Sequence, residues 1–205
     1  MNLTSLNKQT YDTLANEYES RVPSLTPVTS EAMDYFTSYL PSNGTVLDLG
    51  CAVGIALKNL HERGFKTTGI EIAPQMVAFA RKRNPHSKII VGDFETASFN
   101  AQFDGILAFA FIHLFPKQKI PALFQKIRQL LTPTGIALIS TTESPESKEG
   151  LFEKGDFNRG EKRFRKYWTE HELRQALLDA HFKIVALKKF ADPYGKIWMD
   201  FIVSA

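Results

Sequence analysis

TVLDLGCAVG, residues 45–54, is the stretch from which the fold of this chain can be predicted. Its first five residues form a short apolar run typical of a buried strand, with one acid, Asp48, inside it. The small residues Gly50, Ala52 and Gly54 follow, and they predict a sharp turn that a ligand can approach closely. A helical pattern comes next, so the stretch predicts a strand–turn–helix unit.

The alternation of strand and helix continues along the chain. Apolar patterning predicts seven strands, at residues 45–49, 66–70, 88–91, 103–109, 136–140, 182–190 and 198–203. Helical patterns separate most of these strands, which implies right-handed crossovers and a parallel sheet with helices on both faces. A turn sequence at 191–196 joins the last two strands as a hairpin. We therefore expect an α/β fold: a three-layer sandwich around a mostly parallel seven-stranded sheet with an antiparallel C-terminal hairpin strand.

Two segments lie outside this alternation. Residues 1–40 are expected to form a helical lid, with a first helical pattern within residues 1–30 that Pro23 and Pro27 end and a second helix that Ser30 caps. Residues 142–167 are a long polar stretch without a clear period, and long loops in compact domains usually serve a function such as covering a site. We expect one domain over 1–205, in which 142–167 is an insertion that covers the substrate site.

Composition narrows the classes of protein that fit. Hydrophobic residues make up 43% and charged residues 23% of the 205 residues, which excludes a wholly disordered or fibrous chain. The single cysteine, Cys51, excludes an intrachain disulfide and a multi-cysteine zinc site, and we expect no metal. No apolar run approaches the ~18 residues of a membrane span, and the N-terminus has no apolar signal core. We therefore expect a soluble cytoplasmic protein.

The net charge of +3 is concentrated in one segment. Residues 148–166 hold seven Lys or Arg and four Asp or Glu. A nucleic-acid-binding protein usually has a stronger and broader basic footprint. We therefore interpret the segment as a solvated face, and nucleic acid as an unexpected partner.

Polar residues follow three of the predicted strands, where an open parallel sheet binds ligands. Asp48 ends the first strand, Glu71 follows the second, and Asp93 and Phe94 follow the third. An acid after the second strand can accept hydrogen bonds from both hydroxyls of a ribose. The Asp93 carboxylate can accept from an adenine amine while the Phe94 ring stacks on the base. Together these residues predict a site for an adenosine.

The turn after the first strand selects among adenosine cofactors. The dinucleotide fingerprint requires glycine at its first, third and sixth positions, but the third position from Gly50 is Ala52 and the sixth is Ile55. A nicotinamide-dependent reductase is therefore disfavoured, and the Walker sequence for nucleotides is also absent. Asp48 would repel a pyrophosphate and attract an ammonium group, which favours a cofactor with an amino-acid end.

Five motifs in this order resemble those of class I S-adenosylmethionine-dependent methyltransferases: VLDLGCAVG at 46–54, GIEIAPQMVAFAR at 69–81, GDFE at 92–95, FDGILAFAFIHL at 103–114 and LLTPTGIALIS at 130–140. The flanks YDTLANEYESR at 11–21 and YWTEHELRQALLDAHF at 167–182 resemble the small-molecule branch of that family. The resemblance implies a Rossmann-like methyltransferase fold with S-adenosylmethionine as cofactor.

The resemblance also implies where that cofactor lies. Gly50, Ala52 and Gly54 would line its methionine part, with Asp48 near the ammonium and Glu71 on the ribose hydroxyls. The other implied contacts are Ile72 and Met76 beside the adenine, Asp93 and Phe94 reading it, Ala108 and Phe109 over the sulfonium end, and Tyr11, Tyr18 and Arg21 on a helical lid within residues 1–40. Ala52 departs from the family, which more often has glycine there, so we expect its methyl group to be tolerated or to weaken binding.

The activity that the resemblance implies is transfer of a methyl group, by in-line displacement, to an O, N, C or S atom of a small molecule. His113 is the first candidate for a general base, with a packed histidine as the alternative interpretation, and Glu143 is the second candidate. The sequence motif that the resemblance would require for amino groups of nucleic-acid bases is absent. A catalytically silent cofactor-binding protein, acting as a sensor or partner subunit, and a protein or RNA methyltransferase remain alternatives. The oligomeric state stays open.

Overall fold

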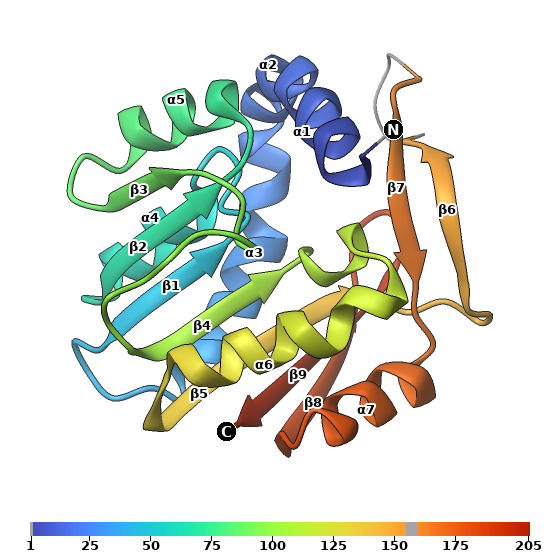
Figure 1. Cartoon of the computed structure of the whole chain (residues 1–205). Coiled ribbons are helices and arrows are strands. Elements are labelled where there is room, and N and C mark those ends of the chain that lie inside the picture. The colour runs from blue at the N-terminus through green and yellow to red at the C-terminus, as the bar shows by residue number, and fades with distance from the viewer. Residues whose placement is uncertain (1, 155–159) are drawn as a thin grey trace.

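The computed structural model of the chain describes residues 2–154 and 160–205. In it, adjacent residues of the central strands face two different hydrophobic cores, one on each side of the sheet. In β1 (Thr45–Leu49), Val46 belongs to the core formed with α3 (Val22–Thr37) and α4 (Ile55–Glu62), whereas Leu47 belongs to the core under α6 (Ile120–Leu130). Successive side chains of a strand point to opposite faces, so helices cover both sides of the sheet. The result is the three-layer arrangement seen in Figure 1.

The central sheet has seven strands in the order β3-β2-β1-β4-β5-β9-β8. The other six strands are β2 (Lys66–Glu71), β3 (Lys88–Val91), β4 (Phe103–Phe109), β5 (Leu131–Thr142), β8 (Lys183–Ala191) and β9 (Ile197–Ser204). The strands from β3 to β5 pair in parallel, and β9 runs antiparallel to both β5 and β8. The predicted fold class is therefore confirmed. The strand order reverses beside β1, so a ligand crevice is expected at the carboxyl ends of β1 and β4.

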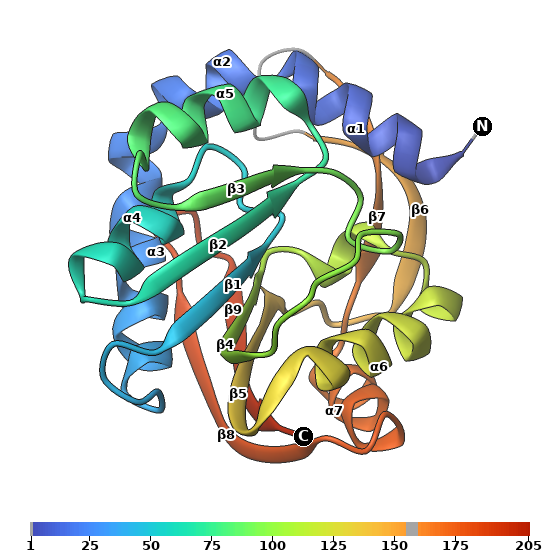
Figure 2. The same ribbon diagram turned by 60° about the vertical axis from the view of Figure 1, so that its left-hand side comes forward.

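The first two helices lie across those carboxyl ends, as Figure 2 shows. They are α1 (Leu3–Thr13) and α2 (Ala15–Ser20). The Asp12 carboxylate accepts a hydrogen bond of 2.8 Å from the backbone N–H of Gln75, and Glu19 forms an ion pair of 2.7 Å with Arg83. Both partners lie in α5 (Pro74–Arg83), so the N-terminal helices are docked on the body of the fold.

The start of α3 differs from the expectation that a helix begins at Ser30. The helix begins at Val22, and Ser30 lies inside it. Pro23 is in the first turn of the helix, where backbone N–H groups have no hydrogen-bond partner within the helix. The N–H that proline lacks is therefore not needed there. Pro27 does remove an internal hydrogen bond. Burial of residues further along the helix, such as Phe36, offsets that loss, so proline alone was a poor guide to the helix boundary.

The 142–167 segment contains a second, two-stranded sheet that the sequence did not predict. Its strands are β6 (Lys148–Glu153) and β7 (Lys162–Tyr167), which pair antiparallel; residues 155–159, including Arg159, lie outside the described residues. The interpretation of this segment as a solvated face fits Lys148, Glu149, Glu153 and Lys162, which are exposed. It is wrong for Lys154, Arg163 and Lys166, which are 4%, 6% and 2% exposed. Figure 1 shows the β6–β7 hairpin standing beside α1.

Backbone-directed hydrogen bonds join α1 to β7. The Asn7 side-chain oxygen accepts from the N–H of Phe164 at 2.8 Å, and the Thr10 hydroxyl donates to the carbonyl of Lys162 at 2.6 Å. The Asn7 side-chain N–H also donates to the carbonyl of Leu114 at 3.2 Å, which ties α1 to the short helix η1 (Ile112–Leu114). The hairpin and the N-terminal helices thus form one cover over the sheet.

Candidate functional site

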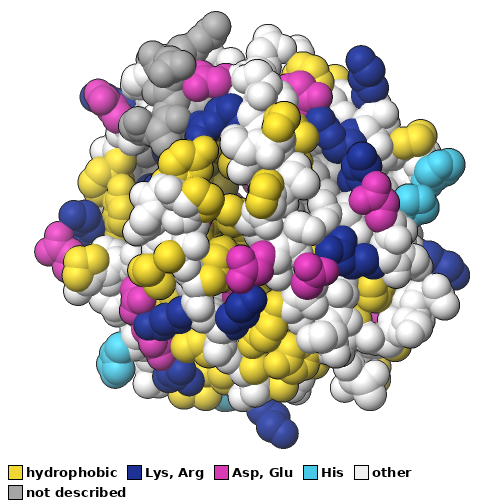
Figure 3. Space-filling view, turned by 180° about the vertical axis from the view of Figure 1, so that it is seen from behind, with side chains coloured by type: hydrophobic (Ala, Val, Ile, Leu, Met, Phe, Trp, Pro, Cys, Tyr) yellow, Lys and Arg dark blue, Asp and Glu magenta, His cyan; other side chains and the backbone are white. Residues whose placement is uncertain are grey.

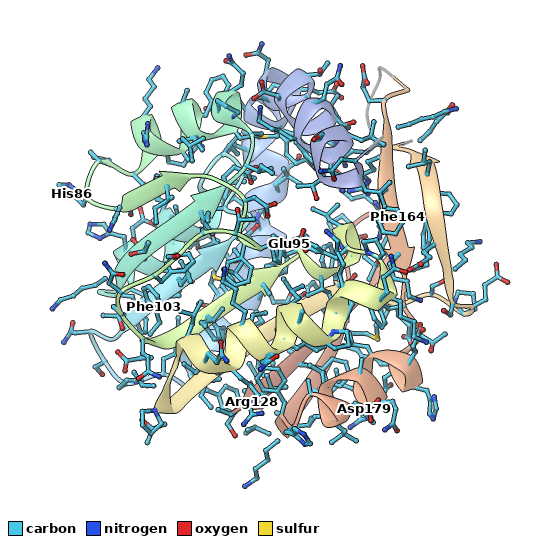
Figure 4. The ribbon with its side chains drawn as sticks, viewed as in Figure 1. His86, Glu95, Phe103, Arg128, Phe164 and Asp179 are labelled. Atoms are coloured by element: carbon cyan, nitrogen blue, oxygen red, sulfur yellow. The ribbon has the colours of Figure 1, made fainter. Side chains whose placement is uncertain are left out.

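A cavity of about 480 Å³ lies at the carboxyl ends of the central strands, beneath this cover. The volume is in the range typical of small-ligand sites. We define its strand-end side by the lining residues Asp48, Gly50, Glu71, Asp93 and Phe94. We define its hairpin side by the lining residues His113, Lys154, Arg163, Arg165 and Lys196. Figure 4 shows β7, marked by Phe164, on the other side of α1 from the strands β1 to β3.

The Glu71 carboxylate is fixed by the backbone around it. One oxygen accepts from the N–H of Ala73 at 2.9 Å, and the other accepts from the N–H of Ala52 at 3.1 Å. Burial raises the pKa of Glu71, and these N–H groups oppose that shift. Each carboxylate oxygen can accept more than one hydrogen bond, so the side chain can hold the turn and still bind hydroxyl groups of a ligand in the cavity.

Asp48 lies beside Glu71 and is only 3% exposed. Burial and the negative charge of Glu71 raise the pKa of Asp48 to about 8. A cationic group in the cavity would favour the ionised carboxylate. The pair of buried acids therefore suits a ligand that brings positive charge to this end of the cavity.

The raised pKa of Asp48 predicts how stability changes with pH. The folded protein keeps the Asp48 carboxyl protonated up to about pH 8, whereas in the unfolded chain the carboxyl has its ordinary pKa of 3.8. The extra proton bound by the folded state stabilises it at low pH, and this contribution to the free energy of unfolding is lost as the pH rises through 8. Between pH 6.5 and 8 we expect the free energy of unfolding to fall by up to about 1.4 kcal/mol per pH unit from this group. Urea unfolding should show a flatter profile for Asp48→Asn in that window. Parallel profiles for the two proteins would contradict the assignment.

The turn at 50–54 depends on backbone conformations that favour glycine. Gly50 has a φ of 69°, and a Cβ there would lie 2.7 Å from the Phe111 ring. Ala52 has a φ of 46°, a left-handed conformation that costs a residue with a side chain roughly 1–2 kcal/mol. The hydrogen bond from Ala52 to Glu71 stabilises this conformation. Both residues line the cavity, so the extra methyl group of Ala52 lies at the site.

The structure brings most of the sequence-predicted residues to this one cavity. They are Tyr11, Tyr18, Arg21, Asp48, Gly50, Ala52, Glu71, Ile72, Asp93, Phe94, Phe109 and His113. Gly54, Met76, Ala108 and Glu143 are described residues that are not in its lining.

Packing explains the placement of three of these four. Gly54 begins α4, and a Cβ there would lie 2.4 Å from the Asn84 side chain, so this glycine allows α4 and α5 to pack closely. Met76 is fully buried in the cluster under the N-terminal helices. Ala108 is fully buried in the core on the α6 side of the sheet.

Glu143 is held away from the cavity. Its backbone N–H donates to the carbonyl of Ile197 at 2.8 Å, and its carboxylate forms an ion pair of 2.8 Å with Lys189. This carboxylate therefore neutralises a lysine of the last strand pair, and we do not carry it forward as a general base.

His113 is buried at the hairpin side, with 3% of its surface exposed. Its Nδ1 lies 3.2 Å from the Thr141 hydroxyl, and the residue lines the cavity. Burial lowers the pKa of His113 well below its ordinary value, and the positive charges of Arg165, Arg163 and Lys154 lower it further. The imidazole is therefore neutral near pH 7 and can accept a proton.

Tyr11 connects the two sides of the cavity. Its hydroxyl accepts a hydrogen bond from the Arg163 guanidinium, and its ring lies 5.9 Å from that of Tyr18, centroid to centroid. On the opposite wall, the Phe109 ring stacks on Trp198 with centroids 4.8 Å apart. Sequence reasoning missed the lining role of Arg163, although the basic excess in 148–166 was a signal for it.

The described part of the chain was searched for metal ligands and for membrane-spanning helices. Within residues 2–154 and 160–205, no three His, Cys, Asp or Glu side chains gather as metal ligands, and no helix there is both long and apolar enough to cross a membrane. On the face shown in Figure 3, the coloured acidic and basic side chains are interspersed, unlike the continuous basic surface typical of nucleic-acid binding.

Comparisons with known proteins agree with this geometry. A family described as "Methyltransferase domain" matches residues 21–187. An "Uncharacterized methyltransferase" of Alkaliphilus oremlandii is 30% identical over 163 residues, which cover 74% of this chain and 75% of the relative. The dTDP-3-amino-3,6-dideoxy-alpha-D-glucopyranose N,N-dimethyltransferase of Streptomyces fradiae is 27% identical over 52% of this chain and 43% of its own length.

Two solved structures show the same fold. The DhpI–SAH complex has a TM-score of 0.76 at 17% identity and covers 98% of this chain and 97% of its own. The Burkholderia thailandensis 1,6-didemethyltoxoflavin-N1-methyltransferase, with 1,6-didemethyltoxoflavin and S-adenosylhomocysteine bound, has a TM-score of 0.71 at 22% identity, covering 93% of this chain and 86% of its own.

Proposed function

This chain belongs to the methyltransferase-domain family and is a class I S-adenosylmethionine-dependent methyltransferase, and from that premise we propose that it methylates a small molecule bound on the hairpin side of the cavity. The observation that carries the proposal is that one covered cavity joins the buried acids Asp48 and Glu71 to His113. A cavity roofed by α1 and the β6–β7 hairpin favours a small acceptor over a macromolecule. The sugar and toxoflavin methyltransferases to which the chain is similar are named for small substrates as well.

The strand-end side fits the cofactor, because buried acids line it and Gly50 presents no side chain. We assign Glu71 to the ribose hydroxyls, Asp48 to the ammonium group, and Asp93 with Phe94 to the adenine. When bound, S-adenosylmethionine supplies a methyl group already activated on a sulfonium, so the cofactor carries the difficult chemistry. The protein contributes mainly by holding the acceptor in line, an effect worth roughly 7–11 kcal/mol in favourable systems.

His113 is the group placed to take a proton from the acceptor. The contact between Nδ1 and Thr141 orients the ring, and the neutral imidazole can accept the proton at Nε2 when a hydroxyl or amine is methylated. The surrounding cations disfavour a lasting imidazolium, so the proton would leave readily. An acceptor that reacts as an anion would need no such transfer.

Replacing His113 tests this function. For His113→Gln we expect the turnover number to fall about 10²–10⁴-fold, as for loss of a general base, with unchanged affinity for S-adenosylhomocysteine. Transfer of radiolabel from S-adenosylmethionine to small molecules of a cell extract would reveal an acceptor for the kinetics, and calorimetry would give the affinity. A variant with lower thermal stability but normal turnover would restore the packing interpretation. Cofactor binding by the wild type without transfer to any extract would instead indicate a catalytically silent protein.

A further inference from the structure

The loop after β3 carries both residues that we assign to the adenine, Asp93 and Phe94, and we call residues 93–97 the adenine loop. Asp93 closes a turn in it: the Asp93 carbonyl accepts from the N–H of Ala97 at 2.9 Å, and the carboxylate accepts from the N–H of Glu95 at 2.9 Å. Glu95 is labelled in Figure 4. Asp93 and Phe94 line the cavity, so the shape of this turn decides how they face the ligand.

The ammonium group of Lys126 joins the adenine loop to α6. It donates to the carbonyls of Phe94 and Ala97 at 2.6 Å and to the carbonyl of Glu95 at 3.2 Å. A lysine ammonium has three N–H donors, so these three carbonyls can occupy all of them. Hydrogen bonds with a charged donor are among the stronger ones, and here they hold the loop by its backbone.

Lys126 is placed to act on the adenine through the loop and not by direct contact. Among the residues that the structure describes, it lies outside the lining of the cavity. Its ammonium lies 4.9 Å from the centre of the Phe94 ring. Burial lowers the pKa of Lys126, and the negative charges of Asp93 and Glu95 oppose that shift. One side chain is therefore coupled to both residues assigned to the base.

We propose that Lys126 is a positioning residue for the cofactor: its ammonium holds the adenine loop in the shape in which Asp93 and Phe94 recognise the base. The inference rests on the proposed function and adds a residue on which its selectivity depends. Without the ammonium, three carbonyl groups lose their donor and the loop can adopt other conformations. Binding of the cofactor must then order the loop, which weakens binding and makes the placement of the Asp93 carboxylate less exact.

The preference for adenine over hypoxanthine tests the proposal. The two probes are S-adenosylhomocysteine and its deaminated analogue S-inosylhomocysteine, in which a carbonyl oxygen replaces the amine that Asp93 would accept from. Calorimetry measures both affinities. We expect the wild type to bind S-adenosylhomocysteine at least about ten-fold more tightly than the analogue, because the carboxylate loses a hydrogen-bond donor.

Lys126→Met keeps the bulk of the side chain and removes its donors. We expect it to weaken S-adenosylhomocysteine about ten-fold and to reduce the preference for adenine to about three-fold or less. A merely structural role would lower stability, or both affinities equally, and would leave the preference unchanged. Lys126→Gln keeps two donors and should shift the preference in the same direction by a smaller amount, so it serves as the test if Lys126→Met does not fold.

Lys119→Met is the matched control. Lys119 precedes α6 and forms an ion pair of 2.8 Å with Glu95 of the same loop, but its side chain is 41% exposed. Exposed ion pairs contribute little, so this variant should keep the wild-type preference for adenine.

Three outcomes would overturn the proposal. They are an unchanged preference in the folded Lys126 variant, an equal loss of preference in Lys119→Met, and a wild type that binds both probes equally well. In each case retained binding of S-adenosylhomocysteine by the wild type would leave the proposed function standing. Failure of the wild type to bind S-adenosylhomocysteine would count against the proposed function itself.

Discussion

Lys166→Met is expected to lower the free energy of unfolding by about 3–5 kcal/mol, as when one partner of a buried ion pair is removed. Lys166 is 2% exposed, and its ammonium donates to Glu172 at 2.6 Å, to the Ser147 hydroxyl at 2.6 Å and to the carbonyl of Tyr167 at 2.9 Å. The variant leaves the Glu172 carboxylate, whose side chain is 14% exposed, without its buried partner. Urea unfolding of the two proteins measures the difference.

The chain contains a matched control for this variant. Lys117 pairs with the other oxygen of the same Glu172 carboxylate at 2.7 Å, but its side chain is 63% exposed. Exposed ion pairs contribute about 0–1 kcal/mol, so Lys117→Met should have a small effect. Equal losses for the two variants would show that burial of Lys166 is not what stabilises the contact between β7 and α7 (Glu170–Asp179).

Glu71→Ala is expected to weaken S-adenosylhomocysteine binding by about 2–3 kcal/mol, or roughly 30- to 150-fold, since it removes two hydrogen bonds to the ribose. The effect should be near the upper end, because Glu71 also accepts from Ala52 and Ala73 and so shapes the turn that lines the cavity. Calorimetric titration measures the loss.

Glu71→Gln is the conservative comparison for this experiment. It keeps the length of the side chain and one acceptor oxygen, so its affinity should fall between those of the wild type and Glu71→Ala. Circular dichroism should first show that both variants are folded. An affinity of Glu71→Ala equal to that of the wild type would mean that the ribose is not bound at Glu71.

The middle of the sheet could be predicted well because β1 and β4 are buried on both faces. Their bounds agree with the predicted 45–49 and 103–109, since a continuous apolar run leaves little freedom in placing such strands. The acids at the ends of β1 and β2 were also found from sequence, because parallel strands bring their carboxyl ends to one edge of the sheet.

The β6–β7 hairpin could not be predicted because two of the buried residues of β7 are charged. In β7, Arg163 and Lys166 are buried with Phe164, so hydrophobicity does not alternate along the strand in the way that a half-buried strand requires. Tyr11, the partner of Arg163, is 152 residues away in sequence, and Glu172, the partner of Lys166, lies in the next helix along the chain. The segment's basic charge was visible, but its position inside the molecule was not.

Glu143 shows a similar limit on the site prediction. It follows β5, and residues at such positions often face a ligand. Here the backbone N–H of Glu143 still donates to the Ile197 carbonyl of β9, and the Glu143 carboxylate forms an ion pair with Lys189 of β8. Both partners belong to the antiparallel edge, whose register is set by long-range pairing rather than by residues near Glu143.

Calorimetric titration of the purified wild-type protein with S-adenosylhomocysteine, and with NADH as the comparison, tests the central claim most directly. We predict binding of one S-adenosylhomocysteine per chain with micromolar affinity and no heat from NADH. A protein that is folded by circular dichroism and yet gives no heat with S-adenosylhomocysteine would contradict the assignment of the cavity as a cofactor site.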